Sequence, residues 1–284
     1  MTEKTLDAVE RTALLTAALR AAETRRQDRI YADPYAADLA GDLGPALLSE
    51  IHAATFPAHT PRTLPSTPDY NAIRTRFFDD YLQAEALRTR QIVLAPAGMD
   101  SRAYRMSWPS DVRYFELDRP AVLTYKQDRL GVLKPDMDHR VVATDLTSPD
   151  WEADLIAAGY DPSAPSTWLL EGLLYYIPQD QAHRILGRVA ALQSPGSGIA
   201  ADIVNSAALT LPNMRGLLDV FAGWGCPWLF GTDHPEELFD EHGFDAVAVQ
   251  PGEPGADFGR WPDPVPPRQV ADVRRVFFVH GRRR

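Results

Sequence analysis

The chain has 284 residues, of which 45% are hydrophobic and 24% charged, the composition of an ordinary globular protein that can bury a sizeable core. Its net charge of −10 argues against nucleic acid or an anionic membrane as partner, and no stretch approaches the length of a membrane span. A single cysteine excludes a disulfide framework, and the charged N-terminus lacks the apolar core of a signal peptide, so a cytoplasmic protein is expected.

Residues 1–90 are expected to form a helical cap on a core of residues 91–284. Within this cap, residues 5–27 carry apolar side chains at helical spacing, which predicts an amphipathic helix with Arg20 and Glu23 facing water. The Arg25-Arg26 pair at the end of this segment is interpreted as a solvated helix end.

Proline punctuates the rest of the cap. Pro34 can open a second helix that runs through Leu39. Four prolines within residues 55–70 predict an irregular loop. A further helix is expected from Asn71 to about Thr89, and Arg76 within it is expected to pair at the surface with a neighbouring aspartate.

The most informative stretch of the chain is residues 91–118. An apolar run at 92–95 has the composition of a buried strand, and a turn of small residues at 96–100 follows it. A short helix can form after the turn, and a second strand at 112–118 ends in Asp118. This order is that of the first half of a nucleotide-binding α/β unit, in which Asp118 can hold both ribose hydroxyls.

The turn itself indicates which nucleotide is bound. A pyrophosphate needs several glycines and free backbone N–H groups, whereas this turn keeps only Gly98 and Pro96 has no N–H to donate. A dehydrogenase therefore ranks last among the alternatives. S-adenosylmethionine contains a ribose and an adenine but no phosphate, and its amino-acid end requires one partner for a carboxylate and one for an ammonium.

Several segments resemble the leucine carboxyl methyltransferase-like family of S-adenosylmethionine-dependent methyltransferases, in particular its bacterial small-molecule O-methyltransferases. They are TALLTAALRAAETRR, DPYAADLAG, AGMDSRAYR, FELDRP and EGLLYYIP. The family pattern has a glycine where this chain has Pro96. The resemblance implies an α/β fold with a Rossmann-like, seven-stranded, mostly parallel sheet whose C-terminal strand is antiparallel.

The resemblance also implies the cofactor, S-adenosyl-L-methionine, and its binding residues. Arg74 would hold the cofactor's carboxylate, Glu171 would lie beside its methionine part, and Asp145 with the Leu146 backbone N–H would bind adenine. An alternative for Asp145 is helix capping, and its position at the carboxyl edge of the sheet favours adenine. The full predicted set is Arg74, Ala97, Gly98, Asp100, Asp118, Asp145, Leu146 and Glu171.

Two features support the position of Glu171. A strand of apolar residues, 167–171, ends at this carboxylate, which is costly to bury unless a positive group pairs with it. A cofactor ammonium or sulfonium would supply that charge. Tyr175 and Tyr176 follow, and if the segment is extended one of them belongs to the core and the other can contact substrate.

The remaining chain completes the expected sheet. Further strands are predicted at residues 140–146 and 197–203, and a helix at 179–192. Two last strands, 245–249 and 273–280, suit an antiparallel pair. Residues 205–235 interrupt this alternation and are expected to form a helical lid over the substrate, with candidate substrate contacts at Tyr176, Trp224, Trp228 and Phe230.

These observations predict an O-methyltransferase acting on a small-molecule or peptide natural product, with no metal implied by the histidine spacing. A carboxylate acceptor is already ionised and needs no general base, whereas an alcohol or phenol would need one. The weak candidates for such catalytic roles are Tyr175, Tyr176, His183 and His234. Two alternatives remain, namely a protein that uses the cofactor for something other than methyl transfer and a nonenzymatic binding protein with a decayed site.

Overall fold

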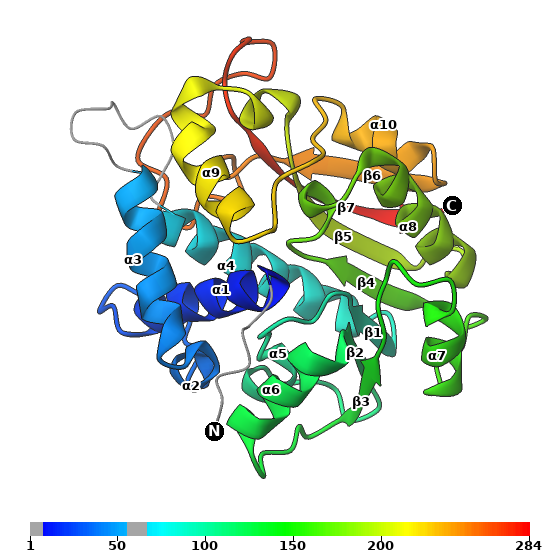
Figure 1. Ribbon diagram of the computed structural model, residues 1–284. Helices are drawn as coiled ribbons and strands as arrows, with labels where there is room; N and C mark the ends of the chain where they lie inside the picture. Colours follow the sequence, from blue (N-terminus) through cyan, green and yellow to red (C-terminus); the bar gives the residue numbers. More distant parts are fainter. Residues whose placement is uncertain (1–7, 56–66) are drawn as a thin grey trace.

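The structure is a computed structural model that describes residues 8–55 and 67–284. A seven-stranded mixed sheet in the order β3-β2-β1-β4-β5-β7-β6 forms its centre (Figure 1). All neighbouring pairs from β3 to β5 are parallel, and β7 is antiparallel to both β5 and β6. The predicted Rossmann-like methyltransferase sheet is therefore confirmed. The strands are β1 (Gln91–Leu94), β2 (Arg113–Asp118), β3 (Asp138–Ala143), β4 (Ser166–Leu170), β5 (Gly198–Val204), β6 (Phe244–Val249) and β7 (Val276–Arg283).

Helices cover both faces of this sheet. One face packs against α7 (Trp151–Ala157), α8 (Gln179–Leu192) and α10 (Pro235–Asp240) in the largest hydrophobic cluster. The other face packs against α4 (Thr67–Ala86) and α5 (Arg102–Arg105), with α6 (Pro120–Leu130) beside them over β2. Because both faces are covered, the inner strands are buried on both sides, which explains their apolar composition.

A third hydrophobic cluster lies beyond the carboxyl ends of the strands. It joins α1 (Ala8–Thr24), α2 (Ala36–Ala40) and α3 (Leu43–Thr55) to α9 (Arg215–Gly223). Figure 1 shows α1 and α3, in blue, next to the yellow α9. Contact between α3 and α9 is close at Gly216, where a Cβ atom would lie 2.6 Å from the carbonyl oxygen of Ala54. The N-terminal helices and the 205–235 insertion thus meet at this end of the sheet.

The N-terminal helices differ from the sequence prediction in several respects. α3 was not predicted, and α4 begins at Thr67 rather than Asn71 because Pro68 fits the first turn of a helix, where no N–H is needed. α4 also ends at Ala86, before Thr89. The part of the predicted irregular loop at 56–66, and residues 5–7 of the first predicted helix, lie outside the described residues.

The expected exposure of Arg20 and Glu23 was wrong. Both side chains are buried, because Arg20 pairs with Asp33 and Glu23 pairs with Arg260 of the β6–β7 connection. Helical periodicity places both residues opposite the apolar face of α1. In the structure this opposite face is also covered, by the segment that contains Asp33 and by the β6–β7 connection. By contrast, Arg76 pairs with Asp80 at the surface, as predicted.

Smaller differences occur further along the chain. α7 was not predicted, and β3 ends at Ala143, three residues before the end of the predicted strand. The predicted final strand at 273–280 begins later, at Val276, and extends to Arg283. Short 3₁₀ turns, among them Leu174–Tyr176, Ser206–Leu209 and Pro212–Met214, complete the connections. Within the described residues, no helix is both long and apolar enough to cross a membrane.

Candidate active site

A cavity opens at the carboxyl ends of β1, β2 and β4, the edge at which open parallel sheets bind ligands. It lies there because the ladder places Leu94 level with Glu116 and Leu169, so the segments that follow the three strands converge. Residues from α1, α4 and α5 complete its walls. Six of the eight predicted cofactor residues line it, namely Arg74, Ala97, Gly98, Asp100, Asp118 and Glu171.

The turn after β1 is held by the end of β2. The N–H of Ala97 donates to the carbonyl of Leu117 (2.8 Å), and the N–H of Gly98 donates to Oδ2 of Asp118 (2.6 Å). Gly98 has a φ of +49°, a conformation that side chains rarely adopt, which explains why this glycine is kept. The Ala95–Pro96 peptide bond is cis, and Pro96 itself lines the cavity.

Asp118 is placed to accept hydrogen bonds from a ligand. One of its oxygens accepts from Gly98 and the other from the N–H of Arg119 (2.7 Å). Burial raises the pKa of Asp118 despite these two backbone donors. Each carboxylate oxygen can accept a second hydrogen bond, so the group can still hold a pair of hydroxyls.

Arg74 and Glu171 form an ion pair inside the cavity, with Nε of Arg74 3.0 Å from Oε1 of Glu171. Arg74 projects from α4 and Glu171 follows β4, so two elements distant in sequence bring the charges together. Burial lowers the pKa of Arg74, but the charges of Asp202 and Glu171 outweigh it and keep that pKa well above its ordinary value. A guanidinium and a carboxylate side by side match the carboxylate and ammonium of a free amino acid.

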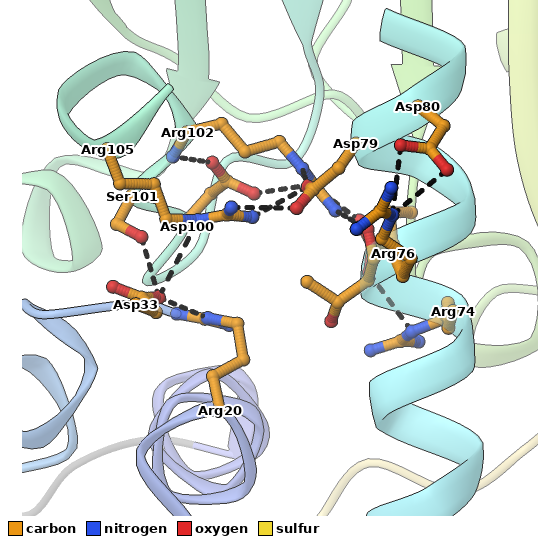
Figure 2. A network of polar contacts seen from close by, with 12 residues as sticks. Arg20, Asp33, Arg74, Arg76, Asp79, Asp80, Asp100, Ser101, Arg102 and Arg105 are labelled. Atoms are coloured by element: carbon orange, nitrogen blue, oxygen red, sulfur yellow. Dashed lines mark hydrogen bonds and ion pairs between the residues drawn. The ribbon is translucent and has the colours of Figure 1, made fainter. Parts of the chain in front are cut away.

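Sequence reasoning did not identify Arg102, which is 2% exposed and lines the cavity at the start of α5. Its Nη1 donates to Asp100 (2.5 Å) and Glu171 (2.7 Å), and its Nε donates to Asp79 (2.6 Å). Figure 2 shows Asp79 between Arg102 and Arg105. Its position in the sequence, directly after the turn at 96–100, could have identified it. An arginine beside a ligand-binding turn is buried only if carboxylates lie nearby to pair with it.

Arg20 was also not identified, although it lines the cavity from α1. Its Nε donates to Asp33 (2.8 Å) and its Nη2 donates to the carbonyl of Met99. Asp33 also accepts from the hydroxyl of Ser101 (2.7 Å), as Figure 2 shows. These hydrogen bonds attach α1 to the turn after β1, so a displacement of α1 would also displace this turn.

The predicted adenine residues lie outside the cavity lining. The Asp145 side chain is exposed, and its Oδ1 accepts from both the N–H and the hydroxyl of Thr147, at 2.8 and 2.7 Å. Leu146 is buried in the core on the far side of the sheet. In this arrangement Asp145 closes a turn with Thr147 and does not cap a helix, since α7 begins only at Trp151 with Asp150 at its N-cap. Adenine binding at Asp145 remains a prediction.

Tyr175 and Tyr176 both line the cavity. They lie in a 3₁₀ turn rather than an extended segment, so they do not face opposite ways, and their ring centroids are 4.6 Å apart. The hydroxyl of Tyr175 receives a hydrogen bond from Nη1 of Arg74 (3.3 Å). Burial raises the pKa of both phenols, which therefore stay protonated at neutral pH.

The three aromatic residues predicted in the insertion occupy different places. Trp228 packs against Tyr175, with ring centroids 5.0 Å apart, and so lies next to the cavity without being one of its lining residues. Trp224 donates from Nε1 to Glu50 (3.2 Å) and belongs to the cluster that joins α9 to the N-terminal helices. Phe230 belongs to the main core under α8.

Neither of the two predicted histidines reaches the cavity lining. His183 on α8 lies with Nδ1 3.1 Å from Nε2 of His242, beside α10. His234 is exposed at the start of α10. A general-base role for either would need a large rearrangement, because both pack on the α8–α10 side of the molecule. In the parts of the chain that the structure describes, no group of three metal-ligating side chains occurs.

The sheet order and the position of the cavity at the carboxyl edge are those of a class I methyltransferase-like fold. A proposed methyltransferase from Thermobifida fusca, 18% identical in sequence, shares this fold, with a TM-score of 0.63 over 95% of this chain and 94% of that one. Two proposed S-adenosyl-L-methionine-dependent methyltransferases are similar in sequence. One, from Mycobacterium marinum, is 40% identical over 69% of this chain and 63% of its own length. The other, from Mycolicibacterium vanbaalenii, is 40% identical over 68% of this chain and 66% of its own length.

The chain belongs to the leucine carboxyl methyltransferase family, whose family model matches residues 13–190. This confirms the resemblance that the sequence motifs indicated. The predicted cofactor, S-adenosylmethionine, agrees with this family and with the names of both mycobacterial proteins. The matched segment runs from α1 to α8 and so contains every described residue that lines the cavity except Thr12.

Proposed function

We propose that the protein is an S-adenosylmethionine-dependent O-methyltransferase that methylates a carboxylate of a small-molecule or peptide acceptor. The observation that carries the proposal is the placement of Asp118, Arg74 and Glu171 around one cavity at the carboxyl edge of the sheet. Membership of the leucine carboxyl methyltransferase family supports it.

The chemistry of the cavity walls fits this cofactor. Asp118 can hold the ribose hydroxyls, Arg74 the carboxylate and Glu171 the ammonium. Asp145 and the backbone of Leu146 are proposed to bind adenine. Bound S-adenosylmethionine supplies an electrophilic methyl group on a sulfonium, and the chain's own contribution is to orient it and to exclude water.

The acceptor proposal follows from the ionisable groups of the lining. Among its described residues there is no histidine and no lysine, and the lining carboxylates already accept from arginines or backbone N–H groups. Tyr175 and Tyr176, with raised pKa values, can donate hydrogen bonds but cannot act as bases near pH 7. A carboxylic acid with a reference pKa near ~4 is ionised at that pH and needs no base.

The aromatic wall points to the size and polarity of the acceptor. Tyr175 and Tyr176 present large apolar surfaces with polar tips, which suit a partly apolar molecule such as a natural product, and Trp228 packs against Tyr175 from outside the lining. α9 and the N-terminal helices lie at this end, and we propose that they act as lid and cap. One buried cysteine and a net charge of −10 fit a cytoplasmic enzyme.

Calorimetric titration tests the cofactor first. S-adenosylmethionine and S-adenosylhomocysteine should bind in the micromolar range, and NADH, as the control, should not bind. Absence of binding by both sulfur compounds would contradict the proposed site.

The acceptor is tested with methyl-labelled S-adenosylmethionine and a set of aromatic carboxylic acids, each matched with the corresponding alcohol. Label should transfer to the acids, and mild alkali should release it as methanol, because a methyl ester is hydrolysed whereas a methyl ether is not. Alkali-stable label on the alcohols would replace the carboxylate proposal with the hydroxyl alternative.

A further inference from the structure

Asp202 on β5 lies directly behind the cavity. Its side chain is fully buried and is not part of the lining, yet three of its hydrogen-bond partners are lining residues. Oδ1 accepts from the N–H of Gly172 (2.6 Å), and Oδ2 accepts from Nη1 of Arg74 (3.0 Å) and the hydroxyl of Tyr175 (3.4 Å). An acid in the middle of an apolar strand is costly to bury, so its retention calls for a partner and a purpose.

We infer that Asp202 is a positioning residue that acts through Arg74 to keep the cavity open to the amino-acid end of S-adenosylmethionine. This inference rests on the proposed roles of Arg74 and Glu171. It adds a residue to which neither the sequence motifs nor the relatives assign a role.

The reason is that Arg74 shares its charge between two carboxylates. Nε of Arg74 contacts Glu171 and Nη1 contacts Asp202, both at 3.0 Å. An arriving ammonium competes with Arg74 for Glu171, and Asp202 is then the carboxylate that still balances the guanidinium. Without the charge of Asp202, Glu171 would be the one carboxylate among the described residues left in contact with Arg74. The Arg74–Glu171 ion pair would then be stronger, and the ligand's ammonium would displace Arg74 from Glu171 less readily.

Asp202 also fixes the backbone on which Glu171 sits. Gly172, which follows Glu171, has a φ of +68°, and its N–H is held by Asp202. A Cβ atom at this position would lie 3.7 Å from both Nη1 of Arg74 and the hydroxyl of Tyr175, so backbone, guanidinium and phenol are packed together. One buried carboxylate therefore sets the positions of all three.

Two ligands separate a positioning role from a general loss of structure. S-adenosylhomocysteine carries the amino-acid end, whereas 5′-methylthioadenosine has the same adenosine and a thioether but no amino acid. In Asp202→Asn, calorimetry should show S-adenosylhomocysteine binding about tenfold more weakly or worse, with methylthioadenosine within about twofold of wild type. Equal loss of both ligands, or no loss of either, would overturn the inference.

Arg74→Ala distinguishes failure of this inference from failure of the proposed site. It should weaken S-adenosylhomocysteine and spare methylthioadenosine in the same way. If Arg74→Ala has no selective effect, the proposed site is wrong; if it has and Asp202→Asn has not, only the inference is wrong. Asp180→Asn, an exposed carboxylate on α8, is the matched control and should change neither affinity.

The double variant Arg74→Met/Asp202→Asn provides a test that does not depend on the folding of Asp202→Asn. Removing both charges leaves no unpaired guanidinium in the interior. Asparagine keeps a side-chain oxygen that can accept from the N–H of Gly172, so Asp202→Asn removes mainly the charge that balances Arg74. If Asp202 acts through Arg74, the double variant should therefore bind S-adenosylhomocysteine as Arg74→Met does. A further drop in affinity would show that Asp202 acts independently and would overturn the inference.

Discussion

Two ion pairs lie on the same face of the sheet and differ in whether solvent and ligands can reach them. Glu116 on β2 and Lys126 on α6 are 2.7 Å apart and at most 2% exposed, so this pair is closed. Glu171 and Arg74 are similarly close at 3.0 Å, but Glu171 is 17% exposed and both line the cavity. We therefore expect the closed pair to contribute to stability and the pair in the cavity to contribute to ligand binding, although the two have similar geometry.

The largest effect is expected from Glu116→Gln, which leaves the Lys126 charge buried and unpaired. The free energy of unfolding should fall by about 3–5 kcal/mol in urea titrations. Glu116→Gln/Lys126→Met should recover most of this loss, since no charge remains. Both variants, where folded, should bind S-adenosylmethionine nearly as wild type does, and a tenfold loss would contradict the separation of the two pairs.

Glu171→Gln should show the reverse pattern. Affinity for S-adenosylmethionine should fall by about tenfold to a hundredfold in calorimetry, because a hydrogen bond to a charged group contributes roughly 1.5–3 kcal/mol. Unfolding stability should change less than in Glu116→Gln, because solvent reaches the cavity. The exposed Glu237→Gln serves as control, and unchanged affinity in Glu171→Gln would exclude Glu171 as a cofactor residue.

Lowering the pH should reduce the stability that the closed Glu116–Lys126 pair contributes. Burial raises the pKa of Glu116, but Lys126 and His139 outweigh it, so the pKa is lowered in the folded state. A lowered pKa gives stability that is complete above the unfolded value near ~4.3 and is lost as pH falls through the folded value. Urea titrations from pH 7 to 3 should therefore show a steeper acid loss for wild type than for Glu116→Gln, and parallel curves would refute this assignment.

The smallest effect is expected from an exposed pair. Arg184 and Asp180 on α8 are 3.6 Å apart, with most of both side chains in water. In Arg184→Ala, the midpoint of thermal unfolding and the affinity for S-adenosylmethionine should both be indistinguishable from those of wild type, because such pairs are screened. A clear shift in either would mean that proximity alone, without burial, decides the strength of these pairs.

The part of the site that sequence predicted is the part that lies next to the strand ends. Asp118 is the last residue of β2, Glu171 directly follows β4 and Gly98 lies in the turn after β1, and strand periodicity together with the motifs predicted all three. Arg74 on α4 is the exception, because its prediction came from the family motif alone. Arg102 and Asp202 were not predicted from the sequence, because the side chains that they contact come from other helices and strands. Arg20 was misjudged for a related reason, since helix periodicity describes one buried face and cannot show a second.

The positions of the aromatic residues in the 205–235 insertion, which were expected to contact the acceptor, were harder to predict. Trp224, Trp228 and Phe230 lie within seven residues of one another in sequence, yet Trp228 packs next to the cavity, Trp224 on α3 and Phe230 in the main core. Aromatic composition indicated an apolar segment but not its orientation, because no strand ladder fixes residues 205–235. α3 and α7 were not predicted, and α4 begins before the predicted residue because Pro68 fits the first turn of a helix.

The strand order has a consequence for how the protein is made in the cell. One edge of β5 pairs only with β7, which is synthesised after the whole 205–275 segment. Until then the emerging polypeptide presents an uncovered apolar strand, the type of edge that promotes association between unfinished molecules. Premature termination within that segment should therefore yield aggregates and a demand for chaperones, rather than a shortened but active enzyme.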